Sequence, residues 1–225
     1  MTRIMDADNL LLGREVNDGF KYKIIVDTTM SIDKIVDTIN NVQDGTVIYF
    51  NKGTYNFKDK KFLLKNKKNI ELTGYANQAK DTVFNNFNFG SIDSTNINLG
   101  LLTISEASYI TFGNSKNIRL NAINLKSTQI AITKKSKAII SNITSHDSYK
   151  YSPIYISNSI VKADKLDISN DKANCIGVFK NSEVFIYNSK FSNRKYASIY
   201  STNSKIKSLA AKIWQKSKEE IIKFK

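Results

Sequence analysis

A repeating pattern in the second half of the chain most constrains what it can fold into. Short segments built on Asn-Ser or Lys-Ser recur at intervals of roughly 22 residues. They are NSKNI (114–118), KSKAI (135–139), NSIVK (158–162), NSEVF (181–185) and NSKIK (203–207). Three short alternating apolar stretches follow in each unit, which indicates three half-buried strands per repeat. One such unit cannot close a core alone, so the pattern predicts stacked, three-sided coils.

Asparagine is expected to make the turns of these coils. The chain has one proline and nine glycines, few for so many turns, and Asn tolerates left-handed backbone geometry. Four Asn residues fall at one phase of the repeat: Asn114, Asn158, Asn181 and Asn203. We predict that their amides form a hydrogen-bonded ladder between coils. Leucine-rich repeats have a similar length, but their leucine frame and helix are missing here.

Length and composition favour one domain over 1–225. With 225 residues and 41% hydrophobic residues, the chain can bury a full core without a metal or disulfide. The lone Cys175 is expected to be a packed thiol, and no Cys/His spacing suggests zinc. The start shows no signal-peptide pattern, and no apolar run is long enough to cross a bilayer. These features predict a soluble protein, cytoplasmic by default and extracellular if a leader was trimmed or export follows another route.

The formal net charge of +14 favours anionic partners such as an acidic polysaccharide. A second interpretation is compositional, because the joint richness in Lys, Asn and Ile is typical of an AT-rich genome. The lysines are spread along the sequence, and no nucleic-acid-binding motif is present, so a nucleic-acid partner is unlikely on this pattern.

The stretch from the amphipathic segment SIDKIVDTINNV to NKGTYNF resembles the beginning of right-handed parallel β-helix proteins of the pectate lyase-like superfamily. In those proteins a helix caps the open end of the coils, which otherwise exposes apolar side chains and strand edges. The matching residues are Ile32, Ile35, Ile39, Gly45, Thr46, Val47, Ile48, Gly53, Thr54 and Tyr55, with Gly74 closing a further strand.

The fold class is therefore expected to be all-β, a right-handed parallel β-helix solenoid with an N-terminal capping helix and a C-terminal helix. We expect an N-terminal segment and cap helix over 1–43, coils over 44–207, and a helical cap over 208–225. The C-terminal helix rests on near-helical spacing of Leu209, Ile213, Ile221 and Phe224.

The superfamily contains lyases, hydrolases, esterases, epimerases, phage tailspikes and non-catalytic proteins, so the resemblance implies a fold and not an activity. Hydrolases of the polygalacturonase type carry a Gly-His-Gly segment, but the only histidine, His146, has no flanking glycine. Alginate epimerase-like enzymes carry Asp-Pro-His-Asp, of which only His146 and Asp147 are present.

A lyase-like reaction needs a base, often Arg or Lys in this superfamily, and groups that neutralise a carboxylate. Stacking in the proposed phase aligns five polar bends: 105–108, 126–129, 145–151, 169–174 and 192–197. The candidate catalytic residues are Arg194, Lys172 and His146; the candidate substrate-binding residues are Tyr149, Tyr196 and Lys195; and the candidate metal ligands are Asp147 and Asp171, for calcium.

Two functions of different class stand on this sequence. One is binding or lyase-type cleavage of an acidic glycan by the basic bends, with tyrosines stacked on sugar rings: Tyr149, Tyr151, Tyr155, Tyr196 and Tyr200. The other is a non-catalytic scaffold or protein-interaction module, in which the bends are polar only because they face water.

Overall fold

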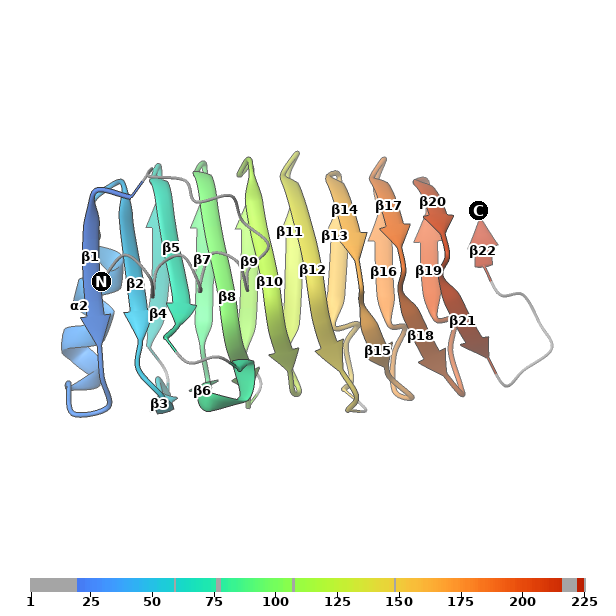
Figure 1. The fold of residues 1–225 in the computed structure, drawn as a ribbon. Helices are drawn as coiled ribbons and strands as arrows, with labels where there is room; N and C mark the ends of the chain where they lie inside the picture. Colours follow the sequence, from blue (N-terminus) through green and yellow to red (C-terminus); the bar gives the residue numbers. More distant parts are fainter. Residues whose placement is uncertain are drawn as a thin grey trace.

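A computed structural model of the chain describes residues 20–215 and 222–224, apart from positions 59, 76–77, 107 and 148. These residues form a parallel β-solenoid with three faces (Figure 1). A short helix α2 (Ile32–Asn40) lies at its N-terminal end, and a single 3-10 turn η1 (Ala79–Asp81) lies beside the early coils. Strands of successive coils pair in parallel, as coil stacking requires.

Face 1 is the longest row of strands in Figure 1. Its members are β1 (Tyr22–Val26), β2 (Thr46–Phe50), β5 (Lys68–Gly74), β8 (Thr95–Ser105), β10 (Ile118–Leu125), β12 (Lys137–Ser145), β14 (Ile160–Asp164), β17 (Glu183–Tyr187) and β20 (Lys205–Leu209). Because β1 already pairs with β2, the stack begins before the helix, one strand earlier than the sequence predicted.

A single residue in each coil forms the corner between face 1 and face 2, which we call the first corner. The long strands β8, β10 and β12 run around this corner, and their ends continue onto face 2. The separate strands of face 2 are β3 (Gly53–Asn56), β6 (Thr82–Asn85), β15 (Asp167–Ser169), β18 (Lys190–Asn193) and β21 (Lys212–Gln215). The residues at this first corner all have positive φ: Leu101, Ala122, Asn142, Lys165, Asn188 and Ala210.

Face 3 is a separate sheet of eight strands among the described residues. They are β4 (Lys61–Lys65), β7 (Asn88–Ile92), β9 (Tyr109–Gly113), β11 (Gln129–Thr133), β13 (Ile154–Ser157), β16 (Ile176–Phe179), β19 (Ile199–Thr202) and β22 (Ile222–Phe224). The repeating coils therefore have the three strands that the alternating pattern predicted.

Apolar side chains from all three faces fill the interior in columns. Ile132, Ile156 and Val178 occupy paired positions of β11, β13 and β16 and are buried, so they form an aliphatic row, which agrees with the alternating apolar pattern of the repeats. The first coils hold rings instead, as Phe50 packs edge-on against Phe84 at 4.6 Å between centroids. Contacts of this kind contribute through burial and ring geometry together.

Helix α2 caps the N-terminal end, as predicted. Its N-cap Ser31 accepts a hydrogen bond from the Lys34 backbone N–H, and Ile35 and Ile39 are buried in the core. The Asn40 side chain accepts from the Leu63 backbone N–H at 2.9 Å and donates to the Lys61 carbonyl at 3.3 Å. These bonds occupy the outer edge of β4, which is the first strand of face 3.

The C-terminal helix expected over 208–225 is wrong for the described residues of that segment. Lys212–Gln215 forms β21, parallel to β18, and Ile222–Phe224 forms β22, parallel to β19. Ala210 has φ 55° at the first corner, so the segment continues the repeat as another coil. The segment contains residues that favour a helix, and these led to the helical prediction. Strand pairing with the previous coil overrides that local preference. Positions 216–221 and 225, which include Ile221, lie outside the described residues.

Buried serines link the coils at the corner between face 3 and face 1, which we call the third corner. The Ser115 hydroxyl accepts a hydrogen bond from the Ser94 backbone N–H at 3.3 Å, and the Ser136 hydroxyl accepts from the Ser115 N–H at 3.0 Å. Ser182 and Ser204 accept in the same way in later coils. Each of these backbone donors, which the corner leaves unpaired, is satisfied by the next coil.

This serine ladder corrects the predicted asparagine ladder. Asn114, Asn158, Asn181 and Asn203 have φ between 48° and 57°, which confirms their turn role. Among the described residues, only the Asn114 amide of these four side chains bonds to another coil, donating to Asp93 at 2.6 Å. An asparagine ladder does form nearby, where Asn117 donates to Asn96 at 2.9 Å and Asn96 to Asn69 at 2.6 Å.

Within the described residues, no helix is long and apolar enough to cross a membrane. The division of 1–225 into a single domain stays a prediction.

The aliphatic row predicts that Ile156→Asp abolishes folding, because it buries a carboxylate with no partner among isoleucines. The expected result is loss of a cooperative melting transition in circular dichroism. Lys162→Asp, which places the same carboxylate on the exposed side of the next strand, β14, is the control and keeps the transition. A soluble, cooperatively melting Ile156→Asp protein would contradict the register.

The serine ladder predicts a loss of about 1–3 kcal/mol in the free energy of unfolding for Ser115→Ala, since a buried N–H loses its acceptor. Urea unfolding measures the loss. Thr111→Ala removes a hydroxyl from the outward, half-buried side of β9 and serves as the control, with a change below about 0.5 kcal/mol. Equal effects of the two substitutions would argue against the ladder.

Candidate functional site

Three consecutive bends between face 2 and face 3 carry the predicted site residues. They cover 146–153 apart from position 148, 170–175 and 194–198, and we call them the bend column. The strands before them are paired in register, with Ser145 opposite Ile168 and Ser169 opposite Ser192. Successive bends are therefore about 4.8 Å apart. The stack thus brings the predicted residues of three coils to one edge of the solenoid.

Two buried asparagines shape the bends. The Asn193 side-chain oxygen accepts hydrogen bonds from the backbone N–H groups of Lys195 at 2.9 Å and Tyr196 at 2.7 Å, and its amide donates to the Ala173 carbonyl at 2.7 Å. Asn170 does the same one coil earlier, accepting from Lys172 and donating to the Tyr151 carbonyl. Each amide therefore supports its own bend and ties it to the bend before. These two asparagines were not predicted from the sequence, where the available signal is a Ser-Asn pair at the same phase of two repeats.

Asp171 links two bends through a hydrogen bond with a backbone group. Its carboxylate accepts from the Arg194 backbone N–H at 3.0 Å. The guanidinium has no part in this bond, so the Arg194 side chain is left exposed, as are those of Lys172 and Lys195. None of the three belongs to an ion pair between described residues. The bends therefore present three cations to solvent.

His146 contacts residues of face 2. Its Nδ1 is 3.4 Å from the Ser169 hydroxyl, and its Nε2 is 3.8 Å from an Asp167 carboxylate oxygen. Lys190 shares the same oxygen, at 3.8 Å. The structure therefore places His146 in a network with Asp167, and within the described part of the chain no hydrogen bond or ion pair joins it to Lys172 or Arg194.

Asp147 fixes its bend to the preceding coil. Its carboxylate accepts hydrogen bonds from the backbone N–H and, at 2.9 Å, from the hydroxyl of Ser127, and from the Ser145 hydroxyl at 3.3 Å. Both predicted metal ligands, Asp147 and Asp171, thus already accept backbone hydrogen bonds. No cluster of three or more His, Cys, Asp or Glu suited to a metal occurs in the described part of the chain. The calcium site stays a prediction that rests on these two carboxylates.

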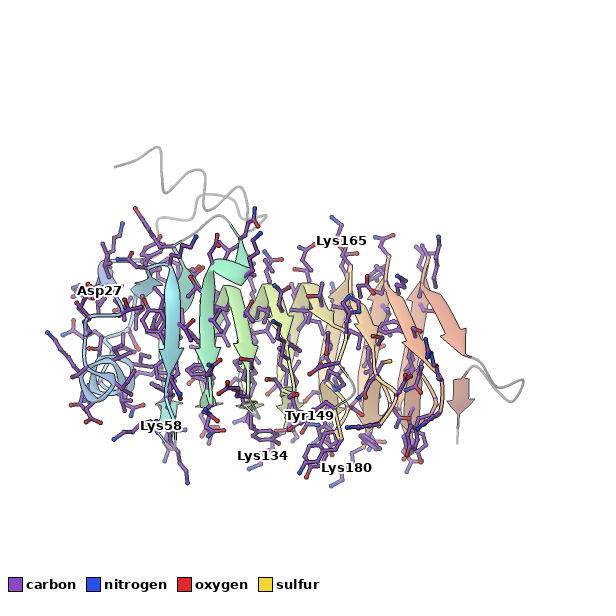
Figure 2. The ribbon with its side chains drawn as sticks, turned by 90° about the horizontal axis from the view of Figure 1, so that it is seen from below. Asp27, Lys58, Lys134, Tyr149, Lys165 and Lys180 are labelled. Carbon is purple, nitrogen blue, oxygen red and sulfur yellow. The ribbon has the colours of Figure 1, made fainter. Side chains whose placement is uncertain are left out.

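The tyrosines of the bends differ in exposure. Tyr149 is half-buried and packs edge-on against Tyr151 at 5.5 Å between ring centroids, and burial raises its pKa, so the phenol stays neutral near pH 7. Tyr149 lies at the margin of the stack seen from below (Figure 2). Tyr151 and Tyr196 are 51% and 48% exposed. Cys175 at the end of the second bend is buried, and burial raises the pKa of its thiol to about 12, which makes it an unreactive thiol.

Rings also gather on the outer side of face 3, directly after the bends. Tyr155, Phe179 and Tyr200 come from β13, β16 and β19, with ring centroids 5.1 Å and 5.7 Å apart along the row. We call these three half-buried rings the aromatic patch. Gly177 makes room for it, since a Cβ atom there would lie 2.7 Å from the Phe179 ring.

Both tyrosines of the patch were predicted from the sequence as sugar-stacking residues, whereas Phe179 and Gly177 were not. The alternation of β16 was the available signal, because Ile176 and Val178 point inward and so place residues 177 and 179 outside.

The coil geometry matches solved right-handed parallel β-helix structures, which is the fold class of this chain. Pectin methylesterase PemA from Erwinia chrysanthemi is 10% identical, aligns over 84% of this chain and 80% of its own, and has a TM-score of 0.56. A point mutant of pectin methylesterase, solved in complex with a hexasaccharide, is 11% identical over 84% and 81% of the two chains, with a TM-score of 0.53.

The PL6 family alginate lyase AlyGC aligns at 10% identity over 82% of this chain and 40% of its own, with a TM-score of 0.33. No protein-family model and no curated protein sequence matches the chain. At these identities the two pectin methylesterase structures show a shared fold, and the fold leaves the activity open.

The contacts of the bends predict opposite outcomes for two neighbouring residues. Asn193→Ala should lower the free energy of unfolding by about 2–3 kcal/mol, because two backbone N–H groups and a carbonyl lose a buried partner. Arg194→Ala should change it by less than about 0.5 kcal/mol, because the backbone N–H that bonds Asp171 remains. Urea unfolding compares them. A larger loss for Arg194→Ala would show that the guanidinium is structural.

Proposed function

We propose that the chain binds an acidic polysaccharide across the bend column and the adjoining aromatic patch. The observation that carries the proposal is the exposure of Lys172, Arg194 and Lys195 on stacked bends, with no ion pair to occupy them among the described residues. Cations in fixed bends suit carboxylates repeated along a glycan, and Arg can bind a carboxylate with two parallel hydrogen bonds.

The aromatic rings beside these cations can contact the sugar rings of the same glycan. Sugar rings have faces of C–H groups, which pack on the electron-rich faces of aromatic rings. Tyr151 and Tyr196 lie within the bends, and Tyr155 and Tyr200 follow each of them four residues later on face 3. The charged and the aromatic surfaces are therefore continuous along the chain, so one glycan can contact both.

The related structures support the ligand class. Two are pectin methylesterases, and one of these was solved with a hexasaccharide. In this chain the ligand class remains our proposal.

Cleavage of the glycan is the weaker form of the proposal. Arg194 and Lys172 stay candidate bases, but His146 contacts Asp167, and Asp147 is bonded to Ser127. Among the described residues, no contact joins a base to a group that would neutralise a substrate carboxylate, and lyase chemistry requires both. Binding alone needs only the exposed cations and rings.

The test is titration with a fluorescently labelled oligogalacturonide. Combined Lys172→Gln, Arg194→Gln and Lys195→Gln substitutions, called the bend variant, should weaken binding by at least about tenfold, since hydrogen bonds to charged groups contribute more than neutral ones. The control variant, Lys162→Gln, Lys165→Asn and Lys207→Gln, removes three exposed cations from face 1 and the first corner and should bind nearly as tightly as the wild type.

Equal weakening in both variants would show binding by net charge alone, and no binding by the wild type would favour a scaffold. Appearance of unsaturated uronate products by ultraviolet absorbance during the titration would establish the lyase form. Loss of those products in Arg194→Gln or Lys172→Gln alone would identify the base.

A further inference from the structure

Lysines that are scattered in the sequence come together at the third corner, on the other side of face 3 from the bend column. Three of them occupy the corner itself, and three begin or precede face 1 strands beside it. We call this set the lysine ridge: Lys116, Lys134, Lys135, Lys137, Lys180 and Lys205. All six side chains are exposed. The set spans five coils, or about 19 Å along the solenoid axis.

The corner backbone is costly for lysine. Lys134, Lys135 and Lys180 have φ of 55°, 64° and 55°. In the coils between and beyond them, Asn114, Asn158 and Asn203 take the corresponding corner position, and Asn tolerates this geometry better than Lys does. The chain therefore keeps a cation at positions where its own repeat offers a less strained residue.

The ridge carries charge that its surroundings leave largely unbalanced. The described ion pairs include none of its six lysines. Of the nearby acids, Asp93 accepts a hydrogen bond from the Asn114 amide, and Glu183 is half-buried, paired with Lys205 in the β17–β20 register. Like charges held at coil spacing repel one another, and an anionic ligand relieves that repulsion.

The opposite side of the molecule shows that this arrangement is local. The first corner has six positive-φ residues among the described coils, and only Lys165 is cationic. Figure 2 shows Lys134 and Lys180 projecting to one side of the stack and Lys165 to the other.

Hydrogen bonds make the spacing of the ridge rigid. The Ser136 hydroxyl donates to the Thr133 carbonyl at 2.6 Å, directly beneath Lys134 and Lys135. Ser182 makes the same bond to the Phe179 carbonyl, also at 2.6 Å, beneath Lys180. The backbone N–H of Lys135 donates to the Asn158 carbonyl of the next coil at 2.6 Å. These bonds therefore fix the backbone from which the corner lysines of the two coils project.

We infer that the lysine ridge is a second anion-binding site, which takes a single linear chain of an acidic polysaccharide lying along the solenoid axis. A narrow row of cations that extends over several coils matches an extended polymer that carries carboxylates along its length. This site is separate from the bend column, because face 3 lies between them. One molecule therefore holds two glycan chains, a conclusion whose ligand class rests on the proposed function.

The experiment is calorimetric titration with oligogalacturonide hexasaccharide at low and high salt. The ridge variant carries Lys134→Asn, Lys135→Asn and Lys180→Asn, which remove three charges and place at each corner a residue suited to positive φ. Its melting temperature should equal or exceed that of the wild type, so lost binding cannot be attributed to unfolding. The control is the Lys162→Gln, Lys165→Asn and Lys207→Gln variant, with the same loss of charge.

Wild type and control should bind two hexasaccharides per chain, and the ridge variant one. Ridge binding should weaken steeply with salt, because it depends on released counterions. One site that only the bend variant removes would overturn the ridge and leave the proposed function standing. A single site that only the ridge variant removes would support the ridge and overturn the proposed binding at the bend column. Tighter binding of single-stranded DNA of equal charge at the ridge would also overturn the inference, since it would identify a different class of ligand.

Discussion

Register between coils is the constraint on which this structure depends. Paired residues stand 20 to 29 positions apart in the chain, as Val83 and Thr103 or Gly53 and Thr82 do. No coil has a core of its own, so a side chain such as Ile156 is buried only while the coils on both sides are in place. At the third corner the serine hydroxyls supply the acceptors that turning strands lack. The surfaces proposed to bind ligands are consequently columns, each built from neighbouring positions in several coils.

The sequence was sufficient to predict features that the repeat sets locally. Alternation placed Ile132, Ile156 and Val178 inside, and the turn preference of Asn114 and Asn158 agrees with their positive φ. Features that depend on neighbouring coils were missed or wrong. The ladder runs through Ser115 and not through Asn114, because only the stack determines which side chain faces the backbone N–H of the preceding coil.

The same limit explains the C-terminal end. In isolation, 208–215 has residues that favour a helix, but β21 pairs with β18 and the local preference is overridden. At the candidate site, the repeat phase correctly brought Asp171 beside Arg194. It could not show that the Arg194 backbone N–H makes the bond, since that depends on how Asn193 shapes the bend. Local periodicity thus predicted the position of the bends but not their contacts.

A division of roles runs through the bends and the third corner. Short polar side chains hold the backbone in place through hydrogen bonds. They are Asn170, Asn193, Asp147 and Asp171 in the bends and the serines at the third corner. Long cationic side chains beside them, such as Lys172 and Lys180, are exposed and belong to no ion pair among the described residues. Stability and the proposed ligand contacts therefore depend on different residues, which allows the surface charge to change without disturbing the coils.

The ladders also determine how a molecule of this kind can grow. Because the hydroxyls of Ser115, Ser136 and Ser182 each accept a hydrogen bond from the backbone of the preceding coil, a duplicated segment of one repeat can make the same bonds with its neighbours. A protein with this repeat can therefore lengthen by whole coils, each of which adds about 4.8 Å along the solenoid axis. The reach of such a protein along a polymer is then counted in repeats, and selection can adjust it through the number of copies alone.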